Sequence, residues 1–254
     1  MTPDTPREQV VIGSRVLAAN GHADMVWGHL SVRDPDGRGV WIKRAGRGFD
    51  ELVPEDVHLL SWDGELLEGQ GPVHLEYHIH TEVMRARDDV GAVVHSHPEA
   101  AVTLAATGLP LQPLGHEGTY FTPPDVPRYR ETGDLIRTPE LGRSVSAALG
   151  DRNALLLVNH GVVVADRDMP STVFAAVLLE KACRMQLAAA AATGGRALIA
   201  SSDEEALAKR ARCYSPSQLR HGWEYLLRAH ARTAADLDRN RPPTTADPST
   251  EVAG

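Results

Sequence analysis

The sequence predicts a layered α/β domain. Its 254 residues suit one large domain of this class, and 42% of them are hydrophobic, which is enough for a sizeable core. Short runs with strand-like patterning are mixed with longer segments of helical periodicity, which is typical of a sheet covered by helices. No internal repeat is visible. We therefore expect one domain over residues 1–238, followed by a disordered Pro- and Thr-rich tail over residues 239–254.

The first helix has clear start and stop signals. Thr5 is placed to cap it, Pro6 suits the first helical position, and Glu8 completes a capping box. Apolar residues then recur with helical spacing as far as Gly21, where we expect the helix to end.

The strands are expected in pairs. Residues 29–33 and 39–43 flank the turn sequence DPDGRG, and VHLLS and ELLEG flank WDG, so each pair predicts a hairpin. Residues 91–97 have the pattern of a buried strand. Residues 153–166 have the pattern of two buried strands that meet at the tripeptide NHG.

Helical patterns cover most of the remaining chain. A long helix is expected to be capped by Ser171 and to end near Gly194. Residues 108–135 are rich in Pro and Gly and are expected to form a long structured loop, a kind of segment that is often functional. The other expected helices span residues 75–87, 98–107, 139–150, 202–212 and 215–236.

Charge and cysteine content exclude several classes of protein. The net charge of -8 argues against nucleic acid as a partner, because phosphate binding needs a basic face. The two cysteines, Cys183 and Cys213, have no CxxC spacing, and we expect no disulfide framework. The N-terminus is polar and acidic, without the pattern of a signal peptide, and no apolar stretch is long enough to cross a bilayer. These features predict a soluble cytoplasmic protein with no membrane partner.

The twelve histidines are clustered, and His95-Ser96-His97 is the clearest group. Side chains at i and i+2 of a strand point to the same face, so both imidazoles would project together from the end of an apolar run. Imidazole is the commonest metal ligand in proteins, and two of them make half of a four-coordinate site. The alternative is a pair of half-buried histidines that hydrogen-bond to the backbone.

Other polar residues strengthen the metal interpretation. His160 also ends an apolar run, and a third imidazole in the same cleft would leave an open position on the ion for water or substrate. Glu76 precedes the helix that leads to the His95 strand, where it is either a general acid/base or a carboxylate favoured by the helix N-terminus. His74 and His78 form a rival metal pair, for which the sequence supplies no third ligand.

Taken together, these motifs resemble the class II aldolase and adducin family. The matching pieces are, in order, GHLSVR, GFDELVPEDV, LEYHIHTEVMRARDDVGAVVHSHP and LLLVNHG, and the resemblance runs from the first helix to about residue 190. It implies a three-layer α/β/α sandwich around a mostly antiparallel sheet. It also implies a homo-oligomer, usually a tetramer, with active sites at the subunit interfaces.

The resemblance assigns roles to the clustered residues. His95, His97 and His160 fall on the three metal-ligand positions, and Glu76 falls on the catalytic carboxylate of the aldolases. The epimerases of the family carry aspartate there, so glutamate favours the carbon–carbon lyases. Three imidazoles suit a zinc ion, with iron, manganese and cobalt as alternatives.

Departures from the family pattern concern the substrate. The sugar-phosphate aldolases carry Asn in place of His29, a Ser pair in place of His74 and its neighbour, and Thr or Ser in place of the loop KRAGRGF, and all three elements serve the substrate phosphate. We therefore predict a substrate without phosphate. Cationic groups suit a carboxylate, so the predicted substrate-binding residues are His29, Lys43, Arg44, Arg47 and His74. For the residues of the loop, the alternative is an ordinary solvated surface.

These inferences favour a decarboxylase of a hydroxylated or aromatic carboxylic acid, like the dihydroxyphthalate decarboxylases that the family contributes to aromatic catabolism. The small-molecule substrate would chelate the cation through adjacent oxygens. Glu76, His116 or Tyr120 would then deliver a proton to carbon. The alternatives are an aldolase for a non-phosphorylated hydroxy-keto acid, a non-haem iron oxygenase, and a non-enzymatic module such as the adducin head domain.

Overall fold

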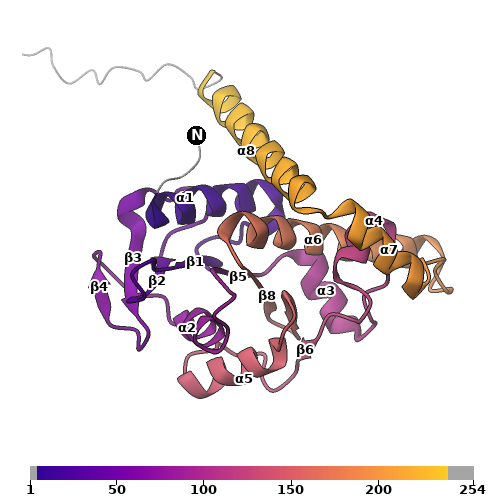
Figure 1. The fold of residues 1–254 in the computed structure, drawn as a ribbon, viewed down its shortest axis with the longest axis horizontal. Helices are drawn as coiled ribbons and strands as arrows, with labels where there is room; N and C mark the ends of the chain where they lie inside the picture. The colour runs from indigo at the N-terminus through magenta and orange to yellow at the C-terminus, as the bar shows by residue number, and fades with distance from the viewer. Residues whose placement is uncertain (1–4, 240–254) are drawn as a thin grey trace, which may run out of the picture.

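The fold is a single mixed sheet between two layers of helices. In the computed structural model, which describes residues 5–239, eight strands follow the order β4-β3-β2-β1-β5-β8-β7-β6 (Figure 1). Every neighbouring pair is antiparallel except β6 and β7. The α/β class and the mostly antiparallel sheet are therefore confirmed. The strands are β1 His29–Arg33, β2 Gly39–Lys43, β3 Val57–Ser61, β4 Leu66–Glu68, β5 Ala92–Ser96, β6 Arg128–Tyr129, β7 Ala154–Leu157 and β8 Gly161–Asp166.

The helices lie on both faces of this sheet. Helices α1, α3 and α6 contact one face, and α2 and α5 contact the other (Figure 1). Their bounds are α1 Pro6–Leu17, α2 Tyr77–Ala86, α3 Glu99–Thr107, α4 Gly115–Phe121, α5 Pro139–Leu149, α6 Met169–Ala192, α7 Asp203–Cys213 and α8 Pro216–Arg239, with a π-helical turn Ala18–His22 and a 3-10 turn Pro54–Asp56.

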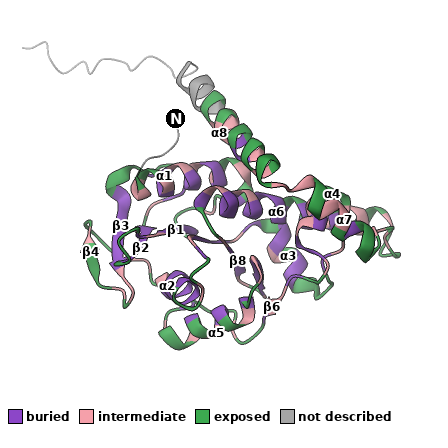
Figure 2. Ribbon diagram, viewed as in Figure 1, coloured by how far each residue is buried: buried purple, intermediate pink, exposed green. Residues whose placement is uncertain are grey.

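Side chains alternate between the two faces of each central strand, so the position of a residue along the strand decides which layer of helices it contacts. On β5, Ala92 and Val94 belong to the core beneath α1, α3 and α6, whereas Val93 belongs to the core beneath α2 and α5. His95 lies two residues after Val93 and points to the same face of the sheet, so its imidazole lies on the α2 side. The buried residues are concentrated on the sheet and on the helix surfaces that face it (Figure 2).

Most of the expected elements are found. Thr5, Pro6 and Glu8 form the predicted capping box, and the helical path ends at the π-helical turn, where Gly21 has a φ of 89°. The two predicted hairpins are β1–β2 and β3–β4, and the buried strands are β5, β7 and β8. Both cysteines are free, as expected.

Two local predictions are wrong. Residues 108–135 are not one loop, because they contain the short helix α4 and the edge strand β6. The cap of α6 is Asp168 and not Ser171, since the Asp168 carboxylate accepts a hydrogen bond from the backbone N–H of Ser171 at 2.8 Å. Ser171 therefore lies in the first turn of the helix. Residues 240–254 of the expected tail lie outside the described part of the chain.

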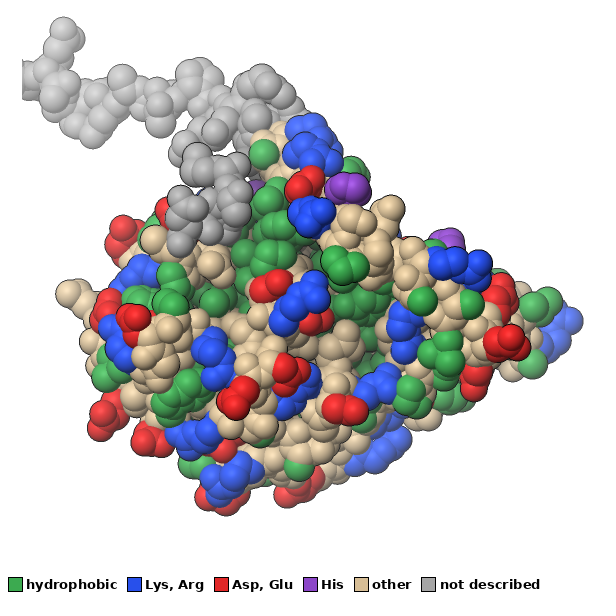
Figure 3. Space-filling view, viewed as in Figure 1, with side chains coloured by type: hydrophobic (Ala, Val, Ile, Leu, Met, Phe, Trp, Pro, Cys, Tyr) green, Lys and Arg blue, Asp and Glu red, His purple; other side chains and the backbone are tan. Residues whose placement is uncertain are grey.

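The described surface is mixed in charge. Lys and Arg side chains are interspersed with Asp and Glu on the face shown in Figure 3, without a continuous basic patch there. Within residues 5–239, the helices are too short or too polar to cross a membrane.

A buried carboxylate fixes the helix that follows the histidine pair. Glu180 of α6 is 2% exposed, and its two oxygens accept the backbone N–H groups of Ala100 and Ala101 at 3.2 and 3.0 Å. These donors lie in the first turn of α3, whose own cap, Pro98, provides no side-chain acceptor. Glu180 thus caps α3 from another helix.

We predict that Glu180→Ala lowers the free energy of unfolding by about 2–3 kcal/mol, because two buried N–H groups lose a charged acceptor. Urea denaturation measures the change. Glu224→Ala is the control: this carboxylate is half exposed and lies 4.0 Å from Arg228, so its loss should cost less than about 1 kcal/mol. Equal effects of the two substitutions would contradict the capping role.

Candidate metal centre

Three histidines from two parts of the chain meet at one end of the central strands. His95 lies in β5, His97 follows that strand, and His160 lies in the turn between β7 and β8. The strands β5 and β8 are neighbours, with His95 opposite Val163. The imidazole centroids are 4.8 to 5.4 Å apart. The sequence-predicted ligand set therefore forms one cluster.

The turn that carries His160 requires its glycine. A Cβ atom at Gly161 would lie 2.6 Å from the backbone oxygen of Ser96 and 2.7 Å from Cδ2 of His97, which are both too close. Asn159, just before the histidine, has a φ of 60°, a left-handed conformation that Asn tolerates better than most residues. The sequence NHG is thus what brings His160 against the other two histidines.

Hydrogen bonds at the outer nitrogens set the tautomers of His95 and His97. Nδ1 of His95 lies 3.0 Å from the carbonyl oxygen of Val162, and Nδ1 of His97 lies 2.8 Å from a carboxylate oxygen of Asp24. Both partners are acceptors, so each Nδ1 carries the proton and each Nε2 keeps a lone pair. The two Nε2 atoms are nevertheless only 3.1 Å apart. Two lone pairs at this distance do not make a hydrogen bond, whereas a cation held between them would satisfy both.

The donor set fits a divalent cation. One nitrogen from each of His95, His97 and His160 lies within 4.8 Å of the others. Burial, and then the neighbouring His97, hold the pKa of His95 well below its usual value and lower that of His160 to about 4. These imidazoles are therefore neutral near pH 7, which is the form that binds metal.

Glu76 faces this cluster and does not cap its own helix. It occupies the cap position of α2, but its carboxylate accepts no hydrogen bond from the first turn. Its Oε1 instead accepts the backbone N–H of Ile136 at 2.9 Å and lies 3.5 Å from Nε2 of His160. Its Oε2 lies 3.6 Å from Nε2 of His95. Burial raises the pKa of Glu76, so the carboxyl group takes up a proton more readily than an exposed glutamate.

A second group of histidines lies on the other side of Glu76. Nε2 of His29 is 3.8 Å from Oε2 of Glu76, and the rings of His29 and His74 are 3.9 Å apart. Burial lowers the pKa of His29 well below its usual value and that of His74 to about 4. His78 packs on Tyr77 and belongs to neither of the metal-ligand groups of three residues found in the described part of the chain, so the rival pair of His74 and His78 stays a prediction.

A cavity of about 510 Å³ opens onto the cluster. Its polar wall includes the predicted residues His74, Glu76, His97 and His160. The apolar wall was not predicted, and Trp27 and Leu75 are 51% and 63% exposed at its mouth. The complete lining is Val26, Trp27, Ala45, Gly46, His74, Leu75, Glu76, His97, Leu135, Asn159 and His160. It contains no lysine or arginine.

The predicted cationic residues of the loop have other partners. Lys43 is fully buried, its ammonium group donates to the backbone oxygens of Val26, at 2.7 Å, and of Arg47, and burial lowers its pKa to about 8. Arg47 lies 3.2 Å from the carboxylate of Asp56, and Arg44 lies 3.7 Å from it. The loop reaches the cavity only through Ala45 and Gly46. Substrate binding by these three residues stays a prediction that the geometry of this chain does not favour.

The two predicted proton donors on α4 also lie away from the cavity. Nδ1 of His116 is 3.4 Å from the thiol of Cys213, and its backbone oxygen accepts a hydrogen bond from Tyr214. Tyr120 packs edge-on against Tyr214, and burial raises the pKa of its hydroxyl. Neither residue lines the cavity, so a donor role for His116 or Tyr120 stays a prediction.

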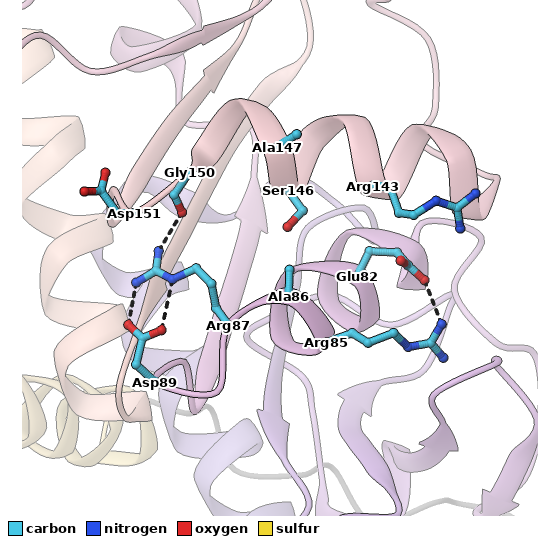
Figure 4. Close-up of a pocket in the computed structure, with 10 residues that line it drawn as sticks. All are labelled: Glu82, Arg85, Ala86, Arg87, Asp89, Arg143, Ser146, Ala147, Gly150 and Asp151. Carbon is cyan, nitrogen blue, oxygen red and sulfur yellow. Dashed lines mark hydrogen bonds and ion pairs between the residues drawn. The ribbon is translucent and has the colours of Figure 1, made fainter.

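A larger hollow, of about 720 Å³, lies between α2 and α5 (Figure 4). Its arginines are already paired with carboxylates: Arg85 lies 3.2 Å from Glu82, and Arg87 lies 2.6 Å from Asp89. Arg143 likewise lies 2.8 Å from Glu140. Neither metal-ligand group found among the described residues lies there. The smaller cavity at the histidines is therefore the better candidate site.

Comparisons with known proteins agree with this geometry. A family model, that of the class II aldolase and adducin N-terminal domain, matches residues 8–187. The chain is 31% identical over 209 residues to a 3,4-dihydroxyphthalate decarboxylase of Arthrobacter keyseri, which covers 78% of this chain and 84% of the relative. A protein of the same name from Terrabacter sp. (strain DBF63) is 32% identical over 213 residues, covering 79% and 88% of the two chains. The solved L-fuculose 1-phosphate aldolase from Glaciozyma antarctica PI12 superposes with a TM-score of 0.79 at 25% identity, over 91% of this chain and 90% of that one.

The carboxylate of Asp24 orients His97, and its removal should weaken metal binding. We predict that Asp24→Asn lowers zinc affinity about 10- to 100-fold, because the second partner of a ligating histidine fixes its tautomer and its ring. Isothermal titration calorimetry measures the change. Asp36→Asn is the control, since Asp36 is exposed and pairs only with Arg38, at 3.8 Å. An unchanged affinity in the Asp24 variant would show that this contact does not position a ligand.

Proposed function

The chain belongs to the class II aldolase and adducin family, and from that premise we propose that it is a carbon–carbon lyase that depends on a divalent metal ion. The reaction we propose is decarboxylation of a non-phosphorylated aromatic hydroxy acid. Relatives at 31% and 32% identity are named dihydroxyphthalate decarboxylases, which supports this reaction class.

The observation that carries the proposal is the convergence of three imidazoles beside one buried carboxylate. His95, His97 and His160 would hold the cation through nitrogen atoms that lie within 4.8 Å of one another. Zinc suits three imidazoles, and iron, manganese or cobalt also accept them. When bound, the cation supplies Lewis-acid stabilisation of the negative charge that develops on the substrate oxygens as the carbon–carbon bond breaks.

Glu76 would move the proton. The backbone N–H of Ile136 holds its Oε1, which leaves Oε2 directed at the histidines. Because burial raises its pKa, the carboxyl group takes up a proton more readily than an exposed glutamate and would transfer it to the carbon that loses CO₂. His116 and Tyr120 are not needed for this step within one chain.

The rest of the cavity would select the substrate. Trp27, Leu75 and Leu135 provide apolar walls, which suit a flat ring and exclude water from it. The absence of lysine and arginine from the lining disfavours a phosphate group, in agreement with the altered residues at positions 29 and 74. The substrate carboxylate would then be recognised at the cation itself.

We also propose that the protein is a homo-oligomer, with a tetramer, which the family resemblance implies, as the expected form. Met25 is 68% exposed, and Trp27 and Leu75, which line the cavity mouth, are also largely exposed. Apolar side chains gathered at one place on a surface mark a contact site. A neighbouring subunit would cover them and close the cavity.

The reaction is tested with metal-free protein that is reconstituted under anaerobic conditions with zinc or manganese. A dihydroxyphthalate should yield CO₂ and the corresponding dihydroxybenzoate in equal amounts. Aldehyde formation from a hydroxy-keto acid would indicate the aldolase alternative. Turnover that requires Fe²⁺ and consumes oxygen would indicate the oxygenase, and either result would contradict the proposed decarboxylase.

In the same assay, Glu76→Gln should lower kcat by about 10²- to 10⁴-fold, the usual contribution of a general acid/base. Glu82→Gln is the matched control: Glu82 is a buried glutamate of the same helix, but it pairs with Arg85 on the side away from the cavity. Its variant should retain wild-type kcat.

A further inference from the structure

The buried nitrogens on the far side of Glu76 lack partners. Nε2 of His29 and Nδ1 of His74 are inaccessible to solvent and make no hydrogen bond. His29 is 0% exposed. A buried polar nitrogen without a partner destabilises the fold, so these two nitrogens next to a carboxylate are available to a ligand.

A hydrogen-bond chain presents His29 as a metal ligand. Nδ1 of His29 lies 2.5 Å from Nε2 of His80, and Nδ1 of His80 lies 2.6 Å from the hydroxyl of Ser31. In the tautomer in which Nδ1 of His80 donates to the hydroxyl of Ser31, Nε2 of His80 accepts a hydrogen bond from Nδ1 of His29. Nε2 of His29 is left with a bare lone pair, which is the arrangement that outer partners give to metal-ligating histidines.

We propose that His29, His74 and Glu76 bind a second divalent cation next to the one held by His95, His97 and His160. The candidate ligand atoms of the three residues lie within 4.8 Å of one another. Three protein ligands with an open position are enough for a metal site of the catalytic kind. The proposal rests on the proposed function only in that it takes the first site to exist.

The carboxylate of Glu76 lies between the two nitrogen sets. Its Oε2 is 3.8 Å from Nε2 of His29 and 3.6 Å from Nε2 of His95. A deprotonated carboxylate that faces two histidine groups would serve as a ligand to both cations before the substrate binds. Substrate oxygens that displace it from the cations would free it for the proton transfer proposed above. A substrate with adjacent oxygens, such as a catechol, could then contact both cations.

The surrounding charge makes the second site the weaker one. The only acidic ligand is Glu76, and the ammonium group of Lys43 acts electrostatically on both His29 and His74. A second cation therefore meets repulsion from Lys43 and from the first ion. We expect two separate binding steps, of which the second has the lower affinity.

The number of bound ions is tested by titrating metal-free protein with Co²⁺, followed by calorimetry, by visible absorption and by elemental analysis after dialysis against buffered metal. The wild type should bind two equivalents per chain in two steps. His74→Ser and His29→Asn, which restore the residues of the sugar-phosphate aldolases, should lose the weaker step and keep the tighter one. His97→Ala should lose the tighter step. The control is His78→Gln, a neighbour on α2 outside both groups, which should keep both steps.

Saturation of the wild type at one equivalent would overturn the second site and leave the proposed function intact. A weaker step that persists unchanged in both His74→Ser and His29→Asn would also overturn it, because the extra ion would then lie elsewhere. A wild type that binds no metal would reject the first site and the proposed function together. The two variants change different elements, so a folding defect in one leaves the other as a test.

Discussion

Two imidazole lone pairs held 3.1 Å apart repel each other, and the candidate site depends on what offsets that repulsion. His95 and His97 are each fixed in this orientation by an acceptor at Nδ1, so neither ring can relieve the contact by exchanging its proton. Burial also holds the pKa of His95 well below its usual value, so this ring does not readily relieve the contact by taking up a proton. A cation between the nitrogens would resolve the conflict, and His160 and Glu76 are placed to complete its surroundings.

The fold places these groups with a small number of rigid elements. The strand β5 lies between β1 and β8, so its end is fixed from both sides by antiparallel pairing. Glu180 anchors the helix that follows His97, and Gly161 lets the His160 turn approach the strand. The histidines on β1 and α2 add a hydrogen-bonded layer beneath Glu76. The carboxylate is thus held by the backbone of Ile136 on one side and faces imidazoles on the other.

Local patterns predicted what depends on neighbours in the sequence. The position of His95 and His97 at the end of a strand, the two hairpins and the Thr5 capping box all follow from short-range rules, and the structure has them. His160 and Glu76 were candidates from their local patterns, and the family resemblance added the expectation that they share a site with His95, because their approach to it depends on the sheet order. Asp24 could not have been identified, since it bonds to a histidine 73 residues away.

The predictions about the cationic loop show that residue types alone do not reveal which charged side chains are already paired or buried. Lys43, Arg44 and Arg47 follow β2 or end it, and their charges suit an anionic substrate. The sequence does not reveal that Lys43 is buried by the loop that it supports, nor that Asp56 lies beside both arginines. Likewise, nothing in the local sequence shows that Trp27 and Leu75 are exposed, because an apolar residue at a cavity mouth cannot be distinguished from a core residue by its type.

The central claim is that one cation binds where these three histidines meet. Anomalous diffraction at the metal absorption edge, from crystals of the metal-loaded protein, tests it directly. We expect a peak about 2.0–2.1 Å from nitrogen atoms of His95, His97 and His160 alike. A loaded, active protein whose anomalous peak lies away from those three rings would contradict it.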